Sequence, residues 1–113
     1  MSHYSGKINW QIAHQQGVKV AIVKATQGNH YTDPMFAQNT KQARKSGIKT
    51  IPYHVFSYHE SGISQARYFA SIIEEYYDNK SVEIAIDIDS TNPSNKDITT
   101  RYIYSPTRET TLF

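Results

Sequence analysis

The sequence predicts an α/β fold built around a parallel β-sheet. Short apolar runs rich in β-branched residues alternate with longer runs of helical periodicity, in the order helix, strand, helix, strand, helix, strand. Glycine follows two of the helical runs, at the position where chains commonly leave a helix. Alternation of this kind favours parallel strands joined by right-handed crossover connections.

The first helix and the first strand follow directly on each other. Residues 8–17 predict a short helix, with Gly17 just beyond its end. Residues 18–26, VKVAIVKAT, are apolar at successive positions rather than at every second one. Such a run is typical of a parallel strand covered on both faces. Residues 27–34, QGNHYTDP, predict a loop.

Asp33 and Pro34 predict the start of the second helix. Aspartate is a favoured N-cap residue, and proline is a favoured first helical residue because it has no N–H to leave unpaired. The helical run continues to Ser46, and Gly47 ends it.

The second and third strands lie on either side of a third helix. Residues 49–58 predict a strand, although Pro52 within it cannot donate a hydrogen bond to a neighbour. Residues 61–80 predict a helix whose apolar side chains recur at steps of three and four. This buried stripe consists of Ile63, Ala66, Ala70, Ile73 and Tyr77. Residues 82–89, VEIAIDID, predict the last clear strand.

Composition excludes several classes of protein. A chain of 113 residues is enough for one domain with a core. The net charge of +2 and the scattered Lys and Arg residues argue against nucleic-acid binding. The chain has no Cys, which excludes disulfides and thiol catalysis. No apolar run reaches the roughly 18 residues of a membrane span, and from the polar N-terminus we expect no signal peptide.

Three segments rich in polar and aromatic residues follow or close the predicted strands. They are KATQGNHY after the first strand, YHVFSY in the second and DID at the end of the third. Ligands of parallel α/β sheets bind at the carboxyl ends of the strands. The sequence therefore predicts a binding site that gathers these three segments.

Asp87 and Asp89 are the main candidates for chemistry. Residues i and i+2 of a strand share a face, about 6.5–7 Å apart at Cα. Two carboxylates this close oppose each other's ionisation, so one pKa is raised and the site can hold one protonated and one ionised acid. Glycoside hydrolysis needs such a pair, about 5–5.5 Å apart in retaining enzymes.

Two other interpretations of Asp87 and Asp89 stay open. An apolar run followed by Asp-x-Asp also suits Mg²⁺ or Mn²⁺ bound to a nucleotide diphosphate, as in many glycosyltransferases. Alternatively the pair is structural, with Asp89 or Ser90 capping the segment that follows.

Four more side chains lie in the strand-end segments. Lys24 either extends its ammonium to solvent at the strand end or faces a carboxylate. Tyr31 and Tyr53 either pack in the core or stack on sugar rings. His54 is most simply a hydrogen-bonded core residue.

Several segments, in order, resemble the opening half of the family 25 glycoside hydrolases, which are lysozymes of the N-acetylmuramidase type. The segments are SHYSGKINW, the long run from VKVAIVKATQGNHYTDP to KSGIK, PYHVF and IAIDID. The resemblance implies a (β/α) barrel of the TIM type that hydrolyses the β-1,4 bond between N-acetylmuramic acid and N-acetylglucosamine. It implies no cofactor and no metal, peptidoglycan glycan strands as the partner, and action outside the cell or at the cell wall.

The resemblance also implies roles for single residues. Asp87 matches the Asp of the family's Asp-x-Glu, and Asp89 stands where the family has its Glu, the general acid. Lys24, Tyr31 and Tyr53 match positions that line the sugar groove.

The chain departs from the family pattern at both ends. The opening Asp-x-Ser is represented only by Met1 and Ser2, and the family domain runs to nearly twice this length. We therefore expect a partial barrel over residues 1–92, incomplete at both ends, followed by an irregular tail over residues 93–113. We also expect reduced activity, because Asp89 is shorter than Glu, and self-association through exposed strand edges.

Overall fold

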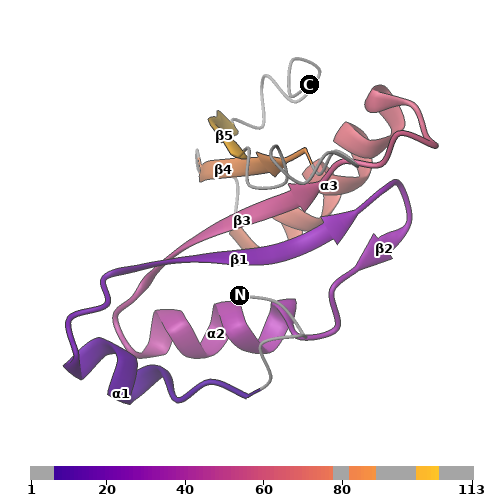
Figure 1. Cartoon of the computed structure of the whole chain (residues 1–113). Coiled ribbons are helices and arrows are strands. Elements are labelled where there is room, and N and C mark those ends of the chain that lie inside the picture. The colour runs from indigo at the N-terminus through magenta and orange to yellow at the C-terminus, as the bar shows by residue number, and fades with distance from the viewer. Residues whose placement is uncertain (1–6, 78–81, 89–98, 105–113) are drawn as a thin grey trace.

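The computed structural model describes residues 7–77, 82–88 and 99–104, which form one β-sheet with three helices (Figure 1). The helices are α1 (Trp10–Gln15), α2 (Phe36–Lys45) and α3 (Gly62–Tyr77). The strands are β1 (Val20–Gln27), β2 (Tyr31–Thr32), β3 (Lys49–Val55), β4 (Val82–Asp87) and β5 (Thr99–Tyr104). The sheet order is β2-β1-β3-β4-β5.

The three strands that the sequence predicts form the parallel centre of the sheet. β1 pairs with β3 and β3 pairs with β4, both in parallel. Pro52 lies inside β3 opposite Val23. Among the described residues the pairing of β3 with β4 begins at Tyr53, so Pro52 lies just before the part of β3 that has partners on both sides.

Two strands were not predicted. β2 consists of two residues in the expected loop and pairs antiparallel with the end of β1. β5 lies where the sequence pattern is ambiguous and an irregular tail is expected, and it pairs antiparallel with all of β4. The third predicted strand therefore has a neighbour on each side. The domain boundary at residue 92 stays a prediction.

The helices and one face of the sheet share a single apolar core. Val23 of β1, Ile84 of β4 and Phe69 of α3 are completely or almost completely buried in it. The opposite face of β1 is open, since Val20 is 47% exposed and Ile22 is 40% exposed. The prediction that this strand is covered on both faces is therefore wrong for its first half.

α1 and α2 end where the sequence predicts, just before Gly17 and Gly47. Gly17 and Gly47 have φ of 97° and 83°, the left-handed conformation that ends a helix at low cost for glycine. α2 begins later than expected: the Asp33 carboxylate accepts a hydrogen bond from Met35 N at 2.9 Å and so caps the turn before the helix.

The buried stripe of α3 is shifted from the predicted one. Ile63 is 69% exposed, whereas Phe69, which the predicted stripe omits, is completely buried. Ala66, Ala70 and Ile73 are buried as expected. Ile63 lies in the first turn of the helix.

The sheet is not closed in the part of the chain that the structure describes. β2 and β5 are its two edge strands, and each pairs with one neighbour. Within the described ranges, no helix combines the length and the apolar character that crossing a bilayer requires.

Candidate active site

Lys24, Tyr53 and Asp87 share the face of the sheet that lies opposite the helices. Lys24 is the register partner of Tyr53, and Tyr53 is the partner of Ala85. Asp87 follows Ala85 by two residues, so it points to the same face at the carboxyl end of β4. Asp89 lies outside the described residues, and the relative placement of the two aspartates stays a prediction.

Lys24 holds a largely buried ammonium group. Its side chain is 7% exposed. Nζ donates a hydrogen bond of 2.8 Å to Gln27 Oε1 and lies 5.4 Å from the centre of the Tyr31 ring. Burial lowers the pKa of Lys24, and the charges of Asp33 and Asp87 oppose this effect. The charges of Asp33 and Asp87 therefore favour the protonated form of an ammonium that burial disfavours, and Gln27 orients it.

The charges of Asp33 and Asp87, which act on Lys24, also act on Tyr53. Burial raises the pKa of its phenol, and the negative charges of Asp87 and Asp33 raise it further. The hydroxyl consequently keeps its proton well into the alkaline range and can donate a hydrogen bond to a ligand.

The negative charge of Asp33 influences Lys24 and Tyr53, although the sequence predicts Asp33 only as a helix cap. It is 2% exposed, and its N–H donates to Ala25 O at 2.8 Å, which fixes it beside the end of β1. Its charge contributes to the pKa of both Lys24 and Tyr53. The only sequence signal for this role was its position in a segment that follows a parallel strand.

His54 belongs to the opposite face and is structural. It is completely buried, and burial is the main cause of its lowered pKa. Its Nε2–H donates to Gln65 Oε1 at 2.9 Å, which leaves Nδ1 to accept from the Thr26 hydroxyl at 2.7 Å. The Gln65 amide in turn donates to Ser57 O and Glu60 O at 2.8 and 3.0 Å. This network ties β1, β3, α3 and the loop between β3 and α3 together.

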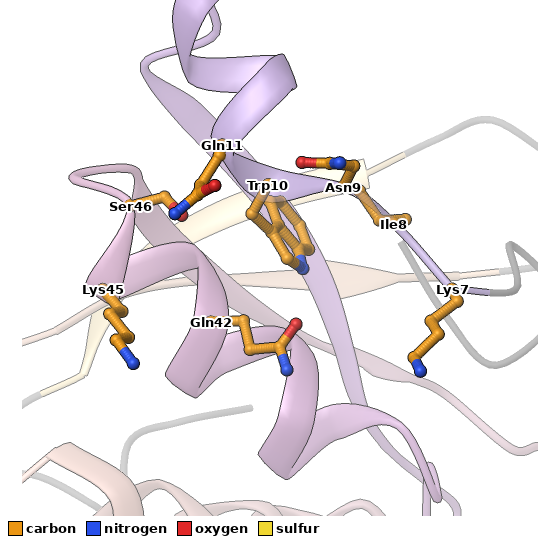
Figure 2. A pocket seen from close by; sticks show the side chains of 8 residues that line it. All are labelled: Lys7, Ile8, Asn9, Trp10, Gln11, Gln42, Lys45 and Ser46. Atoms are coloured by element: carbon orange, nitrogen blue, oxygen red, sulfur yellow. The ribbon is translucent and has the colours of Figure 1, made fainter.

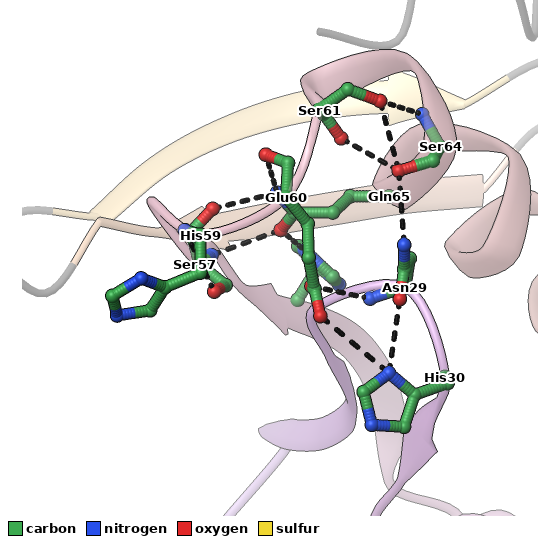
Figure 3. Close-up of polar contacts among 9 residues, drawn as sticks. Asn29, His30, Ser57, His59, Glu60, Ser61, Ser64 and Gln65 are labelled. Atoms are coloured by element: carbon green, nitrogen blue, oxygen red, sulfur yellow. Dashed lines mark hydrogen bonds and ion pairs between the residues drawn. The ribbon is translucent and has the colours of Figure 1, made fainter.

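Glu60 joins the loop after β1 to the loop after β3 (Figure 3). Its Oε2 accepts from Asn29 N at 2.9 Å, and its Oε1 lies 3.5 Å from Nδ1 of His30. Gly28 has φ of 62°, and a Cβ at this position would overlap the Glu60 carboxylate. Glycine therefore permits both the backbone conformation and the close approach of the two loops.

A pocket of about 340 Å³ lies between these loops, which we call the loop pocket. Gln27, His30 and Tyr31 line it on the β1 side, and Ser57 and Glu60 line it on the β3 side. Lys24 also lines it, so the pocket adjoins the charged face.

A second pocket, of about 450 Å³, lies elsewhere (Figure 2). It is formed by α1, the residues before it and the C-terminal half of α2, with the Trp10 ring between Asn9 and Gln42 in the view shown. None of the described residues that line it is acidic. Its described lining therefore offers no carboxylate for acid–base chemistry.

Comparison with known proteins decides the family. The family model described as glycosyl hydrolases family 25 matches residues 1–110. The chain belongs to glycosyl hydrolase family 25. A family 25 glycosyl hydrolase from Bacillus anthracis is similar over 85% of this chain and 48% of its own, with a TM-score of 0.71 and 27% identity.

Lysozymes are among the family 25 relatives. Lysozyme M1 of Streptomyces globisporus is 38% identical over 96 residues, which are 83% of this chain and 32% of that protein. The bacterial lysozyme from Streptomyces coelicolor is 40% identical with a TM-score of 0.61, over 63% of this chain and 33% of its own. The chain thus spans about a third to a half of the length of these relatives.

Proposed function

We propose that this family 25 chain is a lysozyme-like peptidoglycan hydrolase that cleaves the β-1,4 bond between N-acetylmuramic acid and N-acetylglucosamine. The observation that carries the proposal is the position of Asp87 at the carboxyl end of β4, on the same face as Lys24 and Tyr53. Lysozymes among the relatives support peptidoglycan as the substrate class. The site of action is then the cell wall or the space outside the cell.

Asp89 and Asp87 take different roles in this proposal. Asp89 protonates the oxygen that leaves, and Asp87 stabilises positive charge at the anomeric carbon or positions the N-acetyl group of the substrate. The Lys24 ammonium favours the charged form of a nearby carboxylate, which suits the role of Asp87. Tyr53 donates a hydrogen bond to the glycan, and Tyr31 offers its half-open ring as a stacking surface.

We also propose that the sheet is a section of the wall of a (β/α) barrel. Three parallel strands with helices on one face are the repeating arrangement of such a barrel. The open face that carries Lys24, Tyr53 and Asp87 is then the inner side of the barrel, and the carboxyl ends of the strands are its catalytic end.

The test is hydrolysis of purified peptidoglycan, with the new ends identified by reduction and mass spectrometry. We expect N-acetylmuramic acid at the new reducing ends. We expect a rate at least about 10²-fold below that of Lysozyme M1, because Asp89 places its acid about one bond length short of a glutamate.

Matched variants separate the chemistry from the fold. Asp87→Asn and Asp89→Asn should each remove the remaining activity, whereas Glu75→Gln, an exposed change on α3, should not. Activity that a chelator abolishes would instead support the metal-dependent interpretation. New ends that carry N-acetylglucosamine, or full activity in Asp87→Asn, would contradict the proposed reaction.

The second candidate function is glycan binding without hydrolysis. The observation in its favour is Asp89 in place of the glutamate that the family resemblance implies as the general acid. Co-sedimentation with insoluble peptidoglycan, at protein levels that release no new ends, would support this candidate over the hydrolase.

A further inference from the structure

The pocket of about 450 Å³ between α1 and α2, which we call the α1–α2 pocket, lies away from the proposed reaction centre. It shares no described lining residue with the loop pocket. α1 precedes the start of β1, and α2 ends just before β3 begins. The α1–α2 pocket therefore lies towards the amino ends of these strands, whereas Asp87 lies at the carboxyl end of β4 (Figure 1).

The described lining of the α1–α2 pocket carries two ammonium groups and no carboxylate. Lys7 lies on the segment before α1, and Lys45 lies in the last turn of α2. Figure 2 shows their side chains on either side of Trp10 and Gln42. Among the described residues neither ammonium forms an ion pair, so both can bind an anion.

The part of the chain that forms this pocket is strongly basic. Residues 1–59 contain seven Lys and Arg residues and one acidic residue, Asp33. Asp33 caps the turn before α2, at the opposite end of that helix from Lys45. The formal net charge of +2 is therefore unevenly distributed, with the positive charge concentrated around the pocket. A positive surface of this kind attracts anions before they make contact.

The indole of Trp10 adds a donor inside the α1–α2 pocket. Trp10 is 3% exposed, and in Figure 2 its ring nitrogen points into the space between Gln42 and Lys7. Within the described ranges the indole N–H has no hydrogen-bond partner. Because a buried indole N–H usually finds an acceptor, a ligand oxygen in the pocket would complete its bonding.

The remaining polar groups of the lining can also donate. Asn9 Oδ1 accepts from Ile12 N at 3.1 Å, which leaves the amide NH₂ of Asn9 as its donor. The amides of Gln11 and Gln42 and the hydroxyl of Ser46 can each donate as well. Donors beside two ammonium groups suit phosphate, which has more acceptor oxygens than a carboxylate and directs them tetrahedrally.

The C-terminal end of α2 does little to repel an anion from the pocket. The last carbonyls of a helix carry partial negative charge, which opposes an anion when they are left unpaired. Those of Gln42, Ala43 and Arg44 accept hydrogen bonds from the backbone N–H groups of residues 46–48. Arg44 and Lys45 add two positive charges in the same turn.

The volume of the pocket and the burial of Trp10 indicate which anion fits. A pocket of about 450 Å³ has room for a phosphate and for part of the carbon chain that carries it. Nucleic acid also carries phosphates, but proteins that bind single strands stack the bases on accessible aromatic rings. Trp10 is buried and offers no such surface. The hydroxyl groups of a polyol, by contrast, can bond to the amides of Gln11 and Gln42.

We propose that the α1–α2 pocket binds the phosphate groups of a polymer of polyol phosphates. Lys7 and Lys45 hold the phosphate from two sides, and the Trp10 N–H donates to one of its oxygens. The inference does not rest on the proposed function, because the pocket shares no residue with the proposed reaction centre. Such a site gives the chain a second, non-catalytic attachment to a surface on which phosphates repeat, and attachment at two points raises the overall affinity.

The experiment uses the fluorescence of Trp10, which is the one Trp of the chain and therefore reports on this pocket. The full chain is titrated at about pH 7.5, where an ordinary histidine is largely neutral. The probes are sodium phosphate, sodium chloride at equal ionic strength, a short oligomer of glycerol phosphate and an oligothymidylate of similar charge. We expect a saturable change with phosphate at roughly millimolar concentration and none with chloride. We expect affinity for the glycerol phosphate oligomer to be about 10-fold higher than for inorganic phosphate.

Variants test the residues that carry the inference. Lys7 and Lys45 are both exposed, so Lys7→Gln and Lys45→Gln should fold, and each should lower the affinity for the oligomer about 3- to 10-fold. The matched control Lys19→Gln removes an equal charge from an exposed residue outside the lining and should lower it by less than about 2-fold. Trp10→Phe keeps a ring and removes the N–H; calorimetric titration of this variant should show affinity about 3- to 10-fold lower.

Several results would overturn the inference. One is an equal fluorescence change with phosphate and with chloride, and another is a loss of affinity in Lys19→Gln that matches the loss in Lys7→Gln and Lys45→Gln. Oligothymidylate that binds as tightly as the glycerol phosphate oligomer would assign the pocket to nucleic acid. Inorganic phosphate that binds more tightly than the oligomer would assign it to free phosphate. Because binding here needs no cleavage, a chain that hydrolyses peptidoglycan but fails these titrations would leave the proposed function standing, and the reverse result would leave only the phosphate site.

Discussion

Tyr53 and His54 are neighbours on opposite faces of β3, and burial shifts their pKa values in opposite directions. Tyr53 faces the carboxylates, and its raised pKa keeps a donor available to a ligand. His54 faces the helices, and its lowered pKa keeps the ring neutral inside a completed hydrogen-bond network. A neutral ring can both donate and accept, which the two contacts of His54 require.

His54 gives the fold a defined dependence on pH. Its pKa is lowered in the folded state, so above about pH 6.5 both the folded and the unfolded chain hold a neutral ring. As the pH falls through 6.5 the unfolded chain gains a proton first, and the free energy of unfolding decreases. We expect the midpoint of urea unfolding to fall between pH 7.5 and pH 5.5.

The control for this pH effect is an exposed histidine. His14→Asn should retain the dependence, whereas His54→Asn should be less stable at pH 7.5 but lose much of the difference between the two pH values. An unchanged pH dependence in His54→Asn would mean that acidic groups, and not the buried imidazole, produce it.

At the scale of elements, β5 determines how the last parallel strand is protected. β4 would otherwise present one of its edges to solvent, and open strand edges promote pairing with other chains. β5 runs antiparallel along the whole length of β4, with Thr99 opposite Asp87 and Tyr104 opposite Val82. We therefore expect β5 to lower the tendency of β4 to pair with other chains.

Truncation tests the contribution of β5. A chain that ends at residue 98 lacks β5, whereas a chain that ends at residue 104 retains it and loses only the residues beyond. We expect the shorter chain to associate at concentrations where the longer one does not, as measured by size-exclusion chromatography with light scattering. Equal behaviour of the two chains would show that β5 does not protect the edge.

The elements that sequence patterns predict are those whose residues carry the pattern themselves. β1, β3 and β4 are apolar runs of six to eight residues, long enough to be recognised. β2 is only two residues long, and β5 depends on its pairing with β4, which no local pattern in a polar segment indicates. Lys24, Tyr53 and Asp87 could be brought to one face by counting strand positions, but the effect of Asp33 on them depends on how a loop folds back.

For the whole molecule, the face of β1 that carries Val20 and Ile22 is the surface most prone to association. We call it the uncovered face. Val20 and Ile22 expose 47% and 40% of their surface on the side of the sheet that no described helix covers. Exposed apolar side chains on an open sheet are a common cause of association. We therefore expect the chain to self-associate at micromolar concentrations through this face.

A double variant tests the role of the uncovered face. Val20→Thr together with Ile22→Thr should reduce self-association and change the free energy of unfolding by no more than about 0.5 kcal/mol. The matched change Val23→Thr, on the completely buried face of the same strand, should cost about 1–3 kcal/mol and leave association unchanged or worse. Dynamic light scattering against concentration, together with urea unfolding, measures both effects; association that persists in the double variant would place the contact elsewhere.

The alternation of faces along β3 also bears on how this protein can change over generations. Tyr53 can be replaced to suit another ligand while its neighbour His54 continues to hold β3, β1 and α3 together. Selection on Tyr53 thus depends on the ligand, whereas selection on His54 depends on folding. A lineage that loses its substrate would retain His54 longer than Tyr53, and the sheet would outlast the chemistry that it once supported.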